Sequence, residues 1–353
     1  MKLNPFDGMK VLYHEAYWSS ISLGNIPPPI LVTLDPINRC NLRCVWCNSE
    51  EMISHNGELY SEEQIKALPP ALKAWGVRAV CIAGGGEPTI HPLLSDLIFD
   101  LVDHDIEVGV VTNGTRLLDH NEALSRCRWV GVSVDAGSKE TYHAQKGLDR
   151  FDKVIRNISE LRKMYPALEI TYKFLIHPKN ILEIPRAAQI ADEIGCTYFH
   201  ARPAGVTWED IRKNPETRTL FSLPEVELGV RLLNAVAENT WPKGLKVVNT
   251  PGKFTDHTWA IDHGFALCHA VGMTCAIMPN GVVGLCCDRR GDPRVELCHW
   301  EKPEDFIRVW GSDEHLKILK SIKMAECPRC TYAPHNKLFE AFVIRDDTCV
   351  DFL

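Results

Sequence analysis

The 353-residue sequence has none of the long apolar runs that mark membrane or exported proteins. No run approaches the roughly 20 apolar residues that a membrane-spanning helix needs. The first five residues are not followed by the apolar stretch of a secretory signal. Solenoid repeats and low-complexity segments are absent too. These absences predict a cytoplasmic globular protein of about two domains, with no membrane partner.

The sequence also lacks an excess of positive charge. It contains 39 lysines and arginines against 46 aspartates and glutamates, and its formal net charge is -7 at pH 7. A broad nucleic-acid surface needs a positive potential, because it must neutralise phosphates. We therefore do not expect nucleic acid among the partners.

Cysteine, by contrast, is abundant, with 14 residues. Three of them lie within eight residues of one another, and eight follow residue 267. In a chain without an export signal, clustered thiols bind metal more often than they form disulfides. Cys81, Cys127 and Cys196 stand singly in apolar or helical contexts, so we expect buried structural cysteines there.

Residues 30–203 alternate short β-rich runs with amphipathic helices. We expect strands at residues 30–34, 79–83, 107–112, 129–134, 169–176 and 198–200. Helices are expected at residues 61–75, 93–105, 150–165 and 184–194. Six such units predict an α/β fold, a partial (β/α)6 barrel of the TIM type with helices outside a parallel sheet. In such folds the ligand site lies at the C-terminal ends of the strands.

The rest of the chain divides into three further segments. Residues 1–29 form an N-terminal extension, and residues 204–265 form a connector with one helix at about 224–238. Residues 266–353 form a small Cys-rich domain, a β-hairpin plus helix. Its β-like runs at 275–278 and 281–285 flank the dipeptide Asn280-Gly281, which is a strong hairpin signal.

The first cysteine cluster directly follows the first strand and consists of Cys40, Cys44 and Cys47. Three thiolates in one loop can hold three corners of a cubane iron–sulfur cluster and leave the fourth iron without a protein ligand. A catalytic metal site requires such an open position. A zinc loop that lacks one ligand is the alternative.

Glycine and polar residues follow the next three strands. They form the segments Gly84-Gly85-Gly86-Glu87-Pro88, Thr112-Asn113-Gly114-Thr115 and Ser133-Val134-Asp135. Glycines let a backbone approach a ligand closely, and a carboxylate can accept a hydrogen bond from a ligand ammonium. Ser133 and Asp135 point to one face of their strand and suit hydrogen bonds to a ribose.

Together these motifs resemble the radical S-adenosylmethionine (SAM) superfamily over about residues 30–202, with Trp46 as the aromatic residue of C-x3-C-x-(aromatic)-C. The resemblance implies that the first three cysteines bind a [4Fe–4S] cluster whose fourth iron is chelated by SAM. Further contacts to the cofactor are implied for Gly85, Gly86, Glu87, Asn113, Ser133, Asp135, Arg202 and Trp46. The implied reaction is reductive cleavage of SAM, with electrons from a donor such as flavodoxin or ferredoxin. The resulting 5′-deoxyadenosyl radical abstracts hydrogen from a C–H bond.

The C-terminal cysteines resemble a Twitch domain, the shortened relative of the SPASM extension. This resemblance implies a second, auxiliary [4Fe–4S] cluster on Cys268, Cys286, Cys327 and Cys330. A zinc site on the same four thiolates is the alternative. Residues 331–348 contain no further cysteine, which favours one auxiliary cluster. A thiol that returns a hydrogen atom to the substrate is sought among Cys275, Cys287, Cys298 and Cys349.

The reaction itself is less defined than the radical initiator. We expect dehydrogenation or epimerisation of a polar small molecule such as a sugar, aminocyclitol or nucleoside, with the auxiliary cluster transferring electrons. A ribosomal-peptide maturase that cross-links, oxidises or epimerises residues is an alternative, as are a nucleotide cyclase and a non-catalytic metal-binding protein. His91 and His200 are expected to be structural. Substrate contacts are expected among Tyr142, His143, Lys146, Lys173, Arg202 and Trp208.

Overall fold

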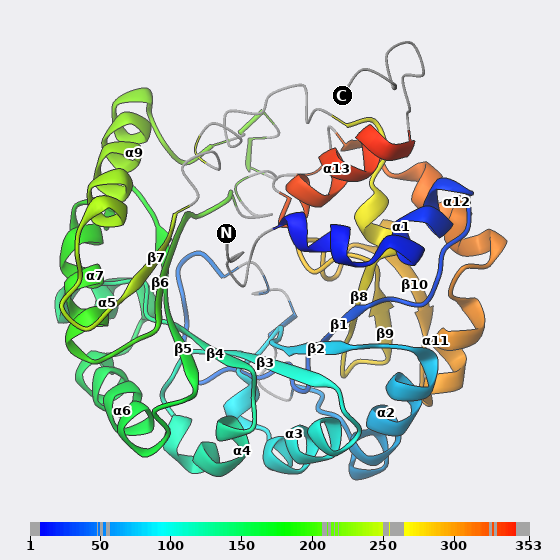
Figure 1. Cartoon of the computed structure of the whole chain (residues 1–353), viewed down its shortest axis with the longest axis horizontal. Coiled ribbons are helices and arrows are strands. Elements are labelled where there is room, and N and C mark those ends of the chain that lie inside the picture. Colours follow the sequence, from blue (N-terminus) through cyan, green and yellow to red (C-terminus); the bar gives the residue numbers. More distant parts are fainter. Residues whose placement is uncertain are drawn as a thin grey trace.

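One continuous curved sheet organises the molecule (Figure 1). The structure is a computed structural model, and it describes residues 8–47, 49, 52–53, 57–206, 210, 213–214, 216–217, 219–249, 254, 265–324, 327 and 330–343. Within these residues, ten strands follow the order β10-β9-β8-β1-β2-β3-β4-β5-β6-β7. Seven consecutive neighbours, from β1 to β7, pair in parallel, which is the arrangement of a partial barrel.

The expected strands are confirmed. The first six are β1 Leu31–Leu34, β2 Ala79–Ile82, β3 Glu107–Thr112, β4 Trp129–Ser133, β5 Glu169–Ile176 and β6 Tyr198–Pro203. Because β6 is longer than expected, His200 lies in its middle and not at its end. The hairpin is β8 Thr274–Ile277 and β9 Val282–Gly284, and β10 Glu296–His299 pairs antiparallel with β9.

Helices line the outer side of the curve (Figure 1). They are α2 Glu62–Trp75, α3 Leu94–Asp103, α4 Asn121–Ser125, α5 Lys139–Lys146, α6 Phe151–Met164, α7 Ile184–Glu193 and α9 Leu223–Glu238. Ser61 begins α2 with a capping box: its hydroxyl accepts from the backbone N–H of Gln64, whose side chain accepts from the N–H of Ser61. Of these helices, α4 and α5 were not expected from the sequence.

The two faces of the sheet differ in polarity, since alternate residues of a strand point to opposite faces. The face beneath the helices is apolar and includes Val32, Leu34, Val80, Ile82, Val108, Val110, Val130 and Val132. The opposite, inner face carries the register neighbours Thr33 and Cys81, Ser133 and Lys173, and then His200 and Arg202 of β6. The sheet therefore buries its apolar face, and the inner face is mixed, because its polar residues lie beside Val111 and Leu175.

Two elements extend the barrel beyond the expected six strands. β7 Lys246–Asn249 lies in the predicted connector and pairs in parallel with β6. On the other side, β8 pairs in parallel with β1, from Leu31 opposite Thr274 to Leu34 opposite Ile277. The Cys-rich hairpin thus continues the barrel sheet. The domain boundaries at residues 203 and 265 stay a prediction.

The remaining described helices are α1 Glu15–Ser22, α11 Pro303–Val309, α12 Asp313–Ser321 and α13 Ala333–Val343. Tyr17 of α1 donates its hydroxyl to the carbonyl of Gly272, and its helix contacts α13. The N-terminal and C-terminal segments therefore pack together. In the part of the chain that the structure describes, every helix is too short or too polar to cross a membrane.

A buried ion pair joins the end of β1 to the segment after the hairpin. Asp35 is fully buried, and its two oxygens accept from Nε of Arg290 at 2.5 Å and from Nη2 at 3.0 Å. Arg290 also donates to the carbonyl of Cys287 at 2.5 Å. Such bidentate, charge-assisted pairs are strong and specific in geometry.

We expect Arg290→Met to lower the free energy of unfolding by about 3–5 kcal/mol, because it leaves the Asp35 carboxylate buried without its partner. Denaturant unfolding measures the change. Arg116→Met is the matched control, because the Arg116–Asp119 pair is exposed and its loss should cost less than about 1 kcal/mol. Equal losses in the two variants would contradict this view of the buried pair.

Candidate active site

The first cysteine cluster forms one loop at the C-terminal end of β1, as the sequence predicts. Cys40, Cys44 and Cys47 are each half-buried, and the N–H of Cys47 donates to the carbonyl of Cys44 at 3.2 Å. Burial raises the pKa of Cys40 to about 12 and also raises the pKa of Cys44. These two thiols are therefore protonated at neutral pH when free, and binding a metal must release their protons.

The glycine-rich segment after β2 lies directly against the start of this loop. The N–H of Gly86 donates to the carbonyl of Ile37 at 3.0 Å, and the N–H of Glu87 donates to the carbonyl of Arg39 at 2.8 Å. A Cβ atom on Gly86 would lie 2.1 Å from the carbonyl oxygen of Arg39, and one on Gly85 would lie 2.8 Å from Oδ1 of Asn38. Only glycine permits this approach.

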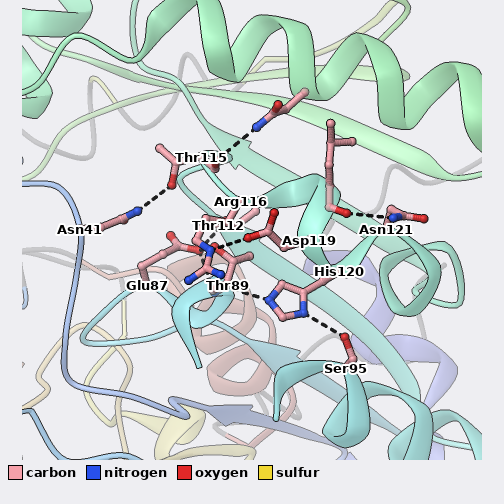
Figure 2. A network of polar contacts seen from close by, with 12 residues as sticks. Asn41, Glu87, Thr89, Ser95, Thr112, Thr115, Arg116, Asp119, His120 and Asn121 are labelled. Carbon is pink, nitrogen blue, oxygen red and sulfur yellow. Dashed lines mark hydrogen bonds and ion pairs between the residues drawn. The ribbon is translucent and has the colours of Figure 1, made fainter. Parts of the chain in front are cut away.

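Glu87 ties the ends of β2 and β3 together (Figure 2). One carboxylate oxygen accepts from the hydroxyls of Thr89 and Thr112, both at 2.5 Å, and from the N–H of Thr89 at 3.0 Å. The other accepts from the N–H of Asn113 at 2.7 Å. Burial raises the pKa of Glu87, while these hydrogen bonds act in the opposite direction. Its role at the methionyl amine stays a prediction.

Asn113 is connected to the cysteine loop through Asn41, which sequence reasoning did not single out. Nδ2 of Asn113 donates to Oδ1 of Asn41 at 2.7 Å. Nδ2 of Asn41 donates to the hydroxyl of Thr115 at 2.8 Å (Figure 2). Asn41 follows the first cysteine of the motif. That position is the only sequence signal for its role.

Asp135 and Lys146 form a second buried pair at the end of β4. The side chains are 2% and 3% exposed, and Nζ of Lys146 donates to one Asp135 oxygen. The other oxygen accepts from the N–H of Leu175 at 2.7 Å. Lys146 and the equally buried Tyr142 were expected to contact substrate, and this stays a prediction. Whether Asp135 and Ser133 contact the ribose stays a prediction.

Trp46 stacks on His177, which follows β5. The ring centroids are 5.2 Å apart and the planes make an angle of 20°. Trp46 is 8% exposed, and burial lowers the pKa of His177. The contribution of His177 was not predicted, because a lone histidine after a strand has no distinctive spacing.

The other side chains that the sequence singled out lie in different parts of the structure. Cys81 of β2 lies near Lys173 and Arg290: burial raises its pKa to about 11, and these two cations oppose the shift. Arg202 is half-buried on β6. His91 is structural, as expected, because it is fully buried and contacts the carbonyl of Tyr60 at 3.2 Å. Trp208 and Cys349 lie outside the described residues.

The C-terminal cysteines converge around Asn336. Its Nδ2 lies 3.9 Å from Sγ of Cys268 and 3.7 Å from Sγ of Cys330, while its Oδ1 accepts from the N–H of Ala270 at 2.8 Å. Arg289 places Nη1 3.9 Å from Sγ of Cys327. The pKa of Cys286 is raised by burial first, and also by the neighbouring Cys268. Thiols from three separate segments thus share one neighbourhood.

The assignment of a hydrogen-donating thiol to one of the other C-terminal cysteines stays a prediction. Cys275 is 2% exposed within the hydrophobic core. Cys298 lies on β10, with Cys275 nearby, and Cys287 lies between Cys286 and the Asp35–Arg290 pair.

Across the described residues, no three cysteine, histidine or acidic side chains are placed to hold a single metal ion. The choice between zinc and an iron–sulfur cluster therefore falls to metal analysis.

The loop and its surroundings fit a bound cluster with an organic ligand. Three soft thiols form the donor set that iron–sulfur clusters use. Three buried polar atoms near the loop have no hydrogen-bond partner: Oδ1 of Asn38, the hydroxyl of Tyr142 and Nε2 of Gln145. Buried polar atoms nearly always have partners. These orphaned atoms are consistent with a site that is completed by a ligand.

Comparison with known protein families identifies the part of the chain that contains this site. Residues 34–189 match the radical SAM superfamily. The chain contains a radical SAM domain. A radical SAM domain implies a [4Fe–4S] cluster and SAM as cofactors, as the three-cysteine motif predicted.

Curated relatives of the radical SAM domain include two kinds of enzyme. The mycofactocin maturase MftC of Mycobacterium tuberculosis is 29% identical over 58% of this chain and 54% of its own. A probable GTP 3′,8-cyclase of Archaeoglobus fulgidus is 36% identical over 35% of this chain and 41% of its own. The chain spans about half the length of these relatives.

Solved structures share the fold over most of the chain. Streptococcus suis SuiB bound to the precursor peptide SuiA has a TM-score of 0.67 at 15% identity, over 95% of this chain and 77% of that one. The protein anSMEcpe with bound AdoMet and the Kp18Cys peptide has a TM-score of 0.62 at 19% identity, over 88% of each chain. Because these matches cover 95% and 88% of the chain, the shared fold extends beyond residues 34–189.

We expect Gly86→Ala to lower the free energy of unfolding by about 1–3 kcal/mol, because the new methyl group forces the glycine segment away from Arg39. Iron uptake by the cysteine loop should fall with it. Gly272→Ala is the control, because its Cβ would make only an ordinary 3.5 Å contact with Ile26. Denaturant unfolding and iron analysis check both. Wild-type stability and iron in Gly86→Ala would show that the close approach is not needed.

Metal analysis tests the second cysteine site. With two cubanes, the anaerobically reconstituted chain should contain about eight irons, and Cys330→Ala or Cys268→Ala should retain about four. Cys196→Ala, a buried thiol remote from both sites, should retain the wild-type content. Four irons together with one zinc in the wild type would replace the auxiliary cluster with a zinc site.

Proposed function

We propose that this radical SAM enzyme modifies a peptide by abstracting a hydrogen atom from one of its C–H bonds. The observation that carries the proposal is the inner face of β4, β5 and β6, which presents the polar side chains of Ser133, Lys173, His200 and Arg202. The fold is shared with two proteins whose structures contain peptides, SuiB with SuiA and anSMEcpe with Kp18Cys. MftC, a maturase by name, adds support from sequence.

When bound, the cluster supplies the electron that splits the sulfonium of SAM and so provides the radical that attacks the substrate. The chain's own residues prepare the site. Cys40, Cys44 and Cys47 would hold three irons, and the strand-end residues fix their loop in one conformation. At this end of the barrel Trp46, Glu87 and Asp135 are buried, whereas the three cysteines are half-buried.

The sugar or aminocyclitol substrate expected from the sequence has no support in the comparisons. Cross-linking, oxidation and epimerisation of a peptide residue all remain within the proposal. Lys173, His200 and Arg202 are the inner-face side chains that we expect to contact the substrate backbone or its acidic groups. We keep an auxiliary cluster with an electron-transfer role, a flavodoxin or ferredoxin as donor, and a cytoplasmic location as parts of the proposal.

Nucleotide cyclisation is the second candidate. The match to the probable GTP 3′,8-cyclase has the higher identity, 36%, but it spans only 35% of this chain. The matched length is too short to include both the radical SAM domain and the Cys-rich region. A radical SAM domain common to both proteins is enough to explain this sequence match, since one fold supports many reactions.

The initiator is tested by SAM cleavage. We expect the reconstituted wild type, with dithionite and SAM in the absence of oxygen, to form 5′-deoxyadenosine, detected by chromatography and mass spectrometry. Cys40→Ala should fall to the level of the control without enzyme, because its cluster loses one of three ligands. Cys127→Ala, at a buried thiol outside the inner face, keeps all three and should retain cleavage. Equal product from Cys40→Ala and wild type would remove the enzyme hypothesis.

The substrate class is tested in the same assay. Peptides encoded by short reading frames beside the gene are compared with GTP as additions to the reaction. The proposal expects a peptide to lose hydrogen, or to take up deuterium from solvent if it is epimerised. A GTP-derived product, with no change in any peptide, would replace the peptide with a nucleotide.

A further inference from the structure

The residues on both sides of Cys44 are fastened to the C-terminal turn of α5. The N–H of Arg43 donates to the carbonyl of Lys146 at 3.1 Å, and the N–H of Val45 donates to the carbonyl of Gln145 at 3.0 Å. Gly147 ends the helix with a φ of +75°, and a Cβ there would lie 3.1 Å from the carbonyl of Arg43. Backbone contacts therefore hold Cys44 against this turn.

The same turn carries a buried cation. The Lys146 ammonium is 3% exposed and pairs with Asp135, whose second oxygen is occupied by the N–H of Leu175. A buried pair whose partners are fixed in this way cannot easily relax by taking up water. Its charges therefore act on whatever lies beside them in a medium of low dielectric constant.

The turn brings this pair close to Cys44, because the carbonyls of Lys146 and Gln145 accept hydrogen bonds from the residues on either side of that cysteine. Tyr142 belongs to the same group: it is fully buried, and its hydroxyl has no hydrogen-bond partner. The C-terminal half of α5 thus presents one ammonium and one unsatisfied hydroxyl near a candidate iron ligand.

We propose that Lys146 is a positioning residue that raises the reduction potential of the cluster held by the cysteine loop, with Tyr142 as a supporting hydrogen-bond donor. Reduction adds one negative charge beside Cys44, and a buried ammonium stabilises the more negative state. Asp135 opposes this effect and holds the ammonium in place. The inference rests on the proposed function, because it needs the cluster to be bound.

The test measures the reduction potential directly, by a redox titration of the reconstituted protein followed by electron paramagnetic resonance. The signal that changes on adding SAM identifies the cluster of the cysteine loop. For Lys146→Met we expect the equilibrium constant for reduction to fall about tenfold, which corresponds to about 59 mV for a one-electron couple. Asp135→Asn should shift the potential in the opposite direction, and Lys146→Arg should restore most of the wild-type value.

Lys139→Met is the matched control, because Lys139 lies at the other end of α5 and is about half exposed. It should leave the potential unchanged. A merely structural role of the buried pair would give Lys146→Met and Asp135→Asn the same direction of change, and this result would overturn the inference. So would a wild-type potential in Lys146→Met with a full iron content.

If Lys146→Met fails to fold or to take up iron, Tyr142→Phe decides the matter. It removes only the hydroxyl, so the protein should fold, and its potential should fall by less than that of the lysine variant. An unchanged potential in Tyr142→Phe would then overturn the inference. A wild type without any signal that responds to SAM would overturn the proposed function as well, so the two failures are distinguishable.

Discussion

The site depends on holding one irregular loop rigid, because three cysteines can face one open position only if their backbone is fixed. The loop is held from three directions. The glycine segment after β2 bonds to Ile37 and Arg39, the Asn113–Thr115 segment after β3 binds Asn41, and the end of α5 accepts from Arg43 and Val45. Each of these contacts uses main-chain or short side-chain atoms, which leaves the loop little freedom to change its conformation. The strand-end motifs are in this sense the scaffold of the loop as much as candidate contacts to the cofactor.

The role of the strand-end residues as a scaffold of the loop explains why Glu87 and Asp135 are buried. A carboxylate that accepts four hydrogen bonds, as Glu87 does, fixes the spacing of two strand ends. A carboxylate paired with Lys146 fixes α5 beneath the loop. Such groups are costly to bury, and the cost is offset only while every partner stays in place. The geometry of the site and the stability of this end of the barrel are therefore coupled.

The sequence allowed the periodic and the local features to be predicted. Alternating apolar strands and amphipathic helices gave the six-unit barrel, and the spacing of Cys40, Cys44 and Cys47 gave the loop. The features that could not be predicted depend on contacts between residues that are far apart in the sequence. β7 is a four-residue strand whose pairing with β6 is set by tertiary structure. α5 buries Gln145 and Lys146, which an apolar pattern cannot reveal. From the sequence, Lys146 would be taken for a solvent-exposed lysine, because its partner Asp135 is not evident. The contribution of His177 is evident only from its stacking on Trp46.

The continuous sheet has a consequence for the two cysteine sites. The cysteine loop follows β1, the C-terminal cysteines flank the hairpin that begins with β8, and these two strands are hydrogen-bonded neighbours. The Asp35–Arg290 pair joins the ends of the same segments a second time. A shift of one site relative to the other would have to break a parallel ladder or expose a buried charge. The separation of the two sites is therefore a fixed property of the fold, and a substrate that draws on both must fit that separation.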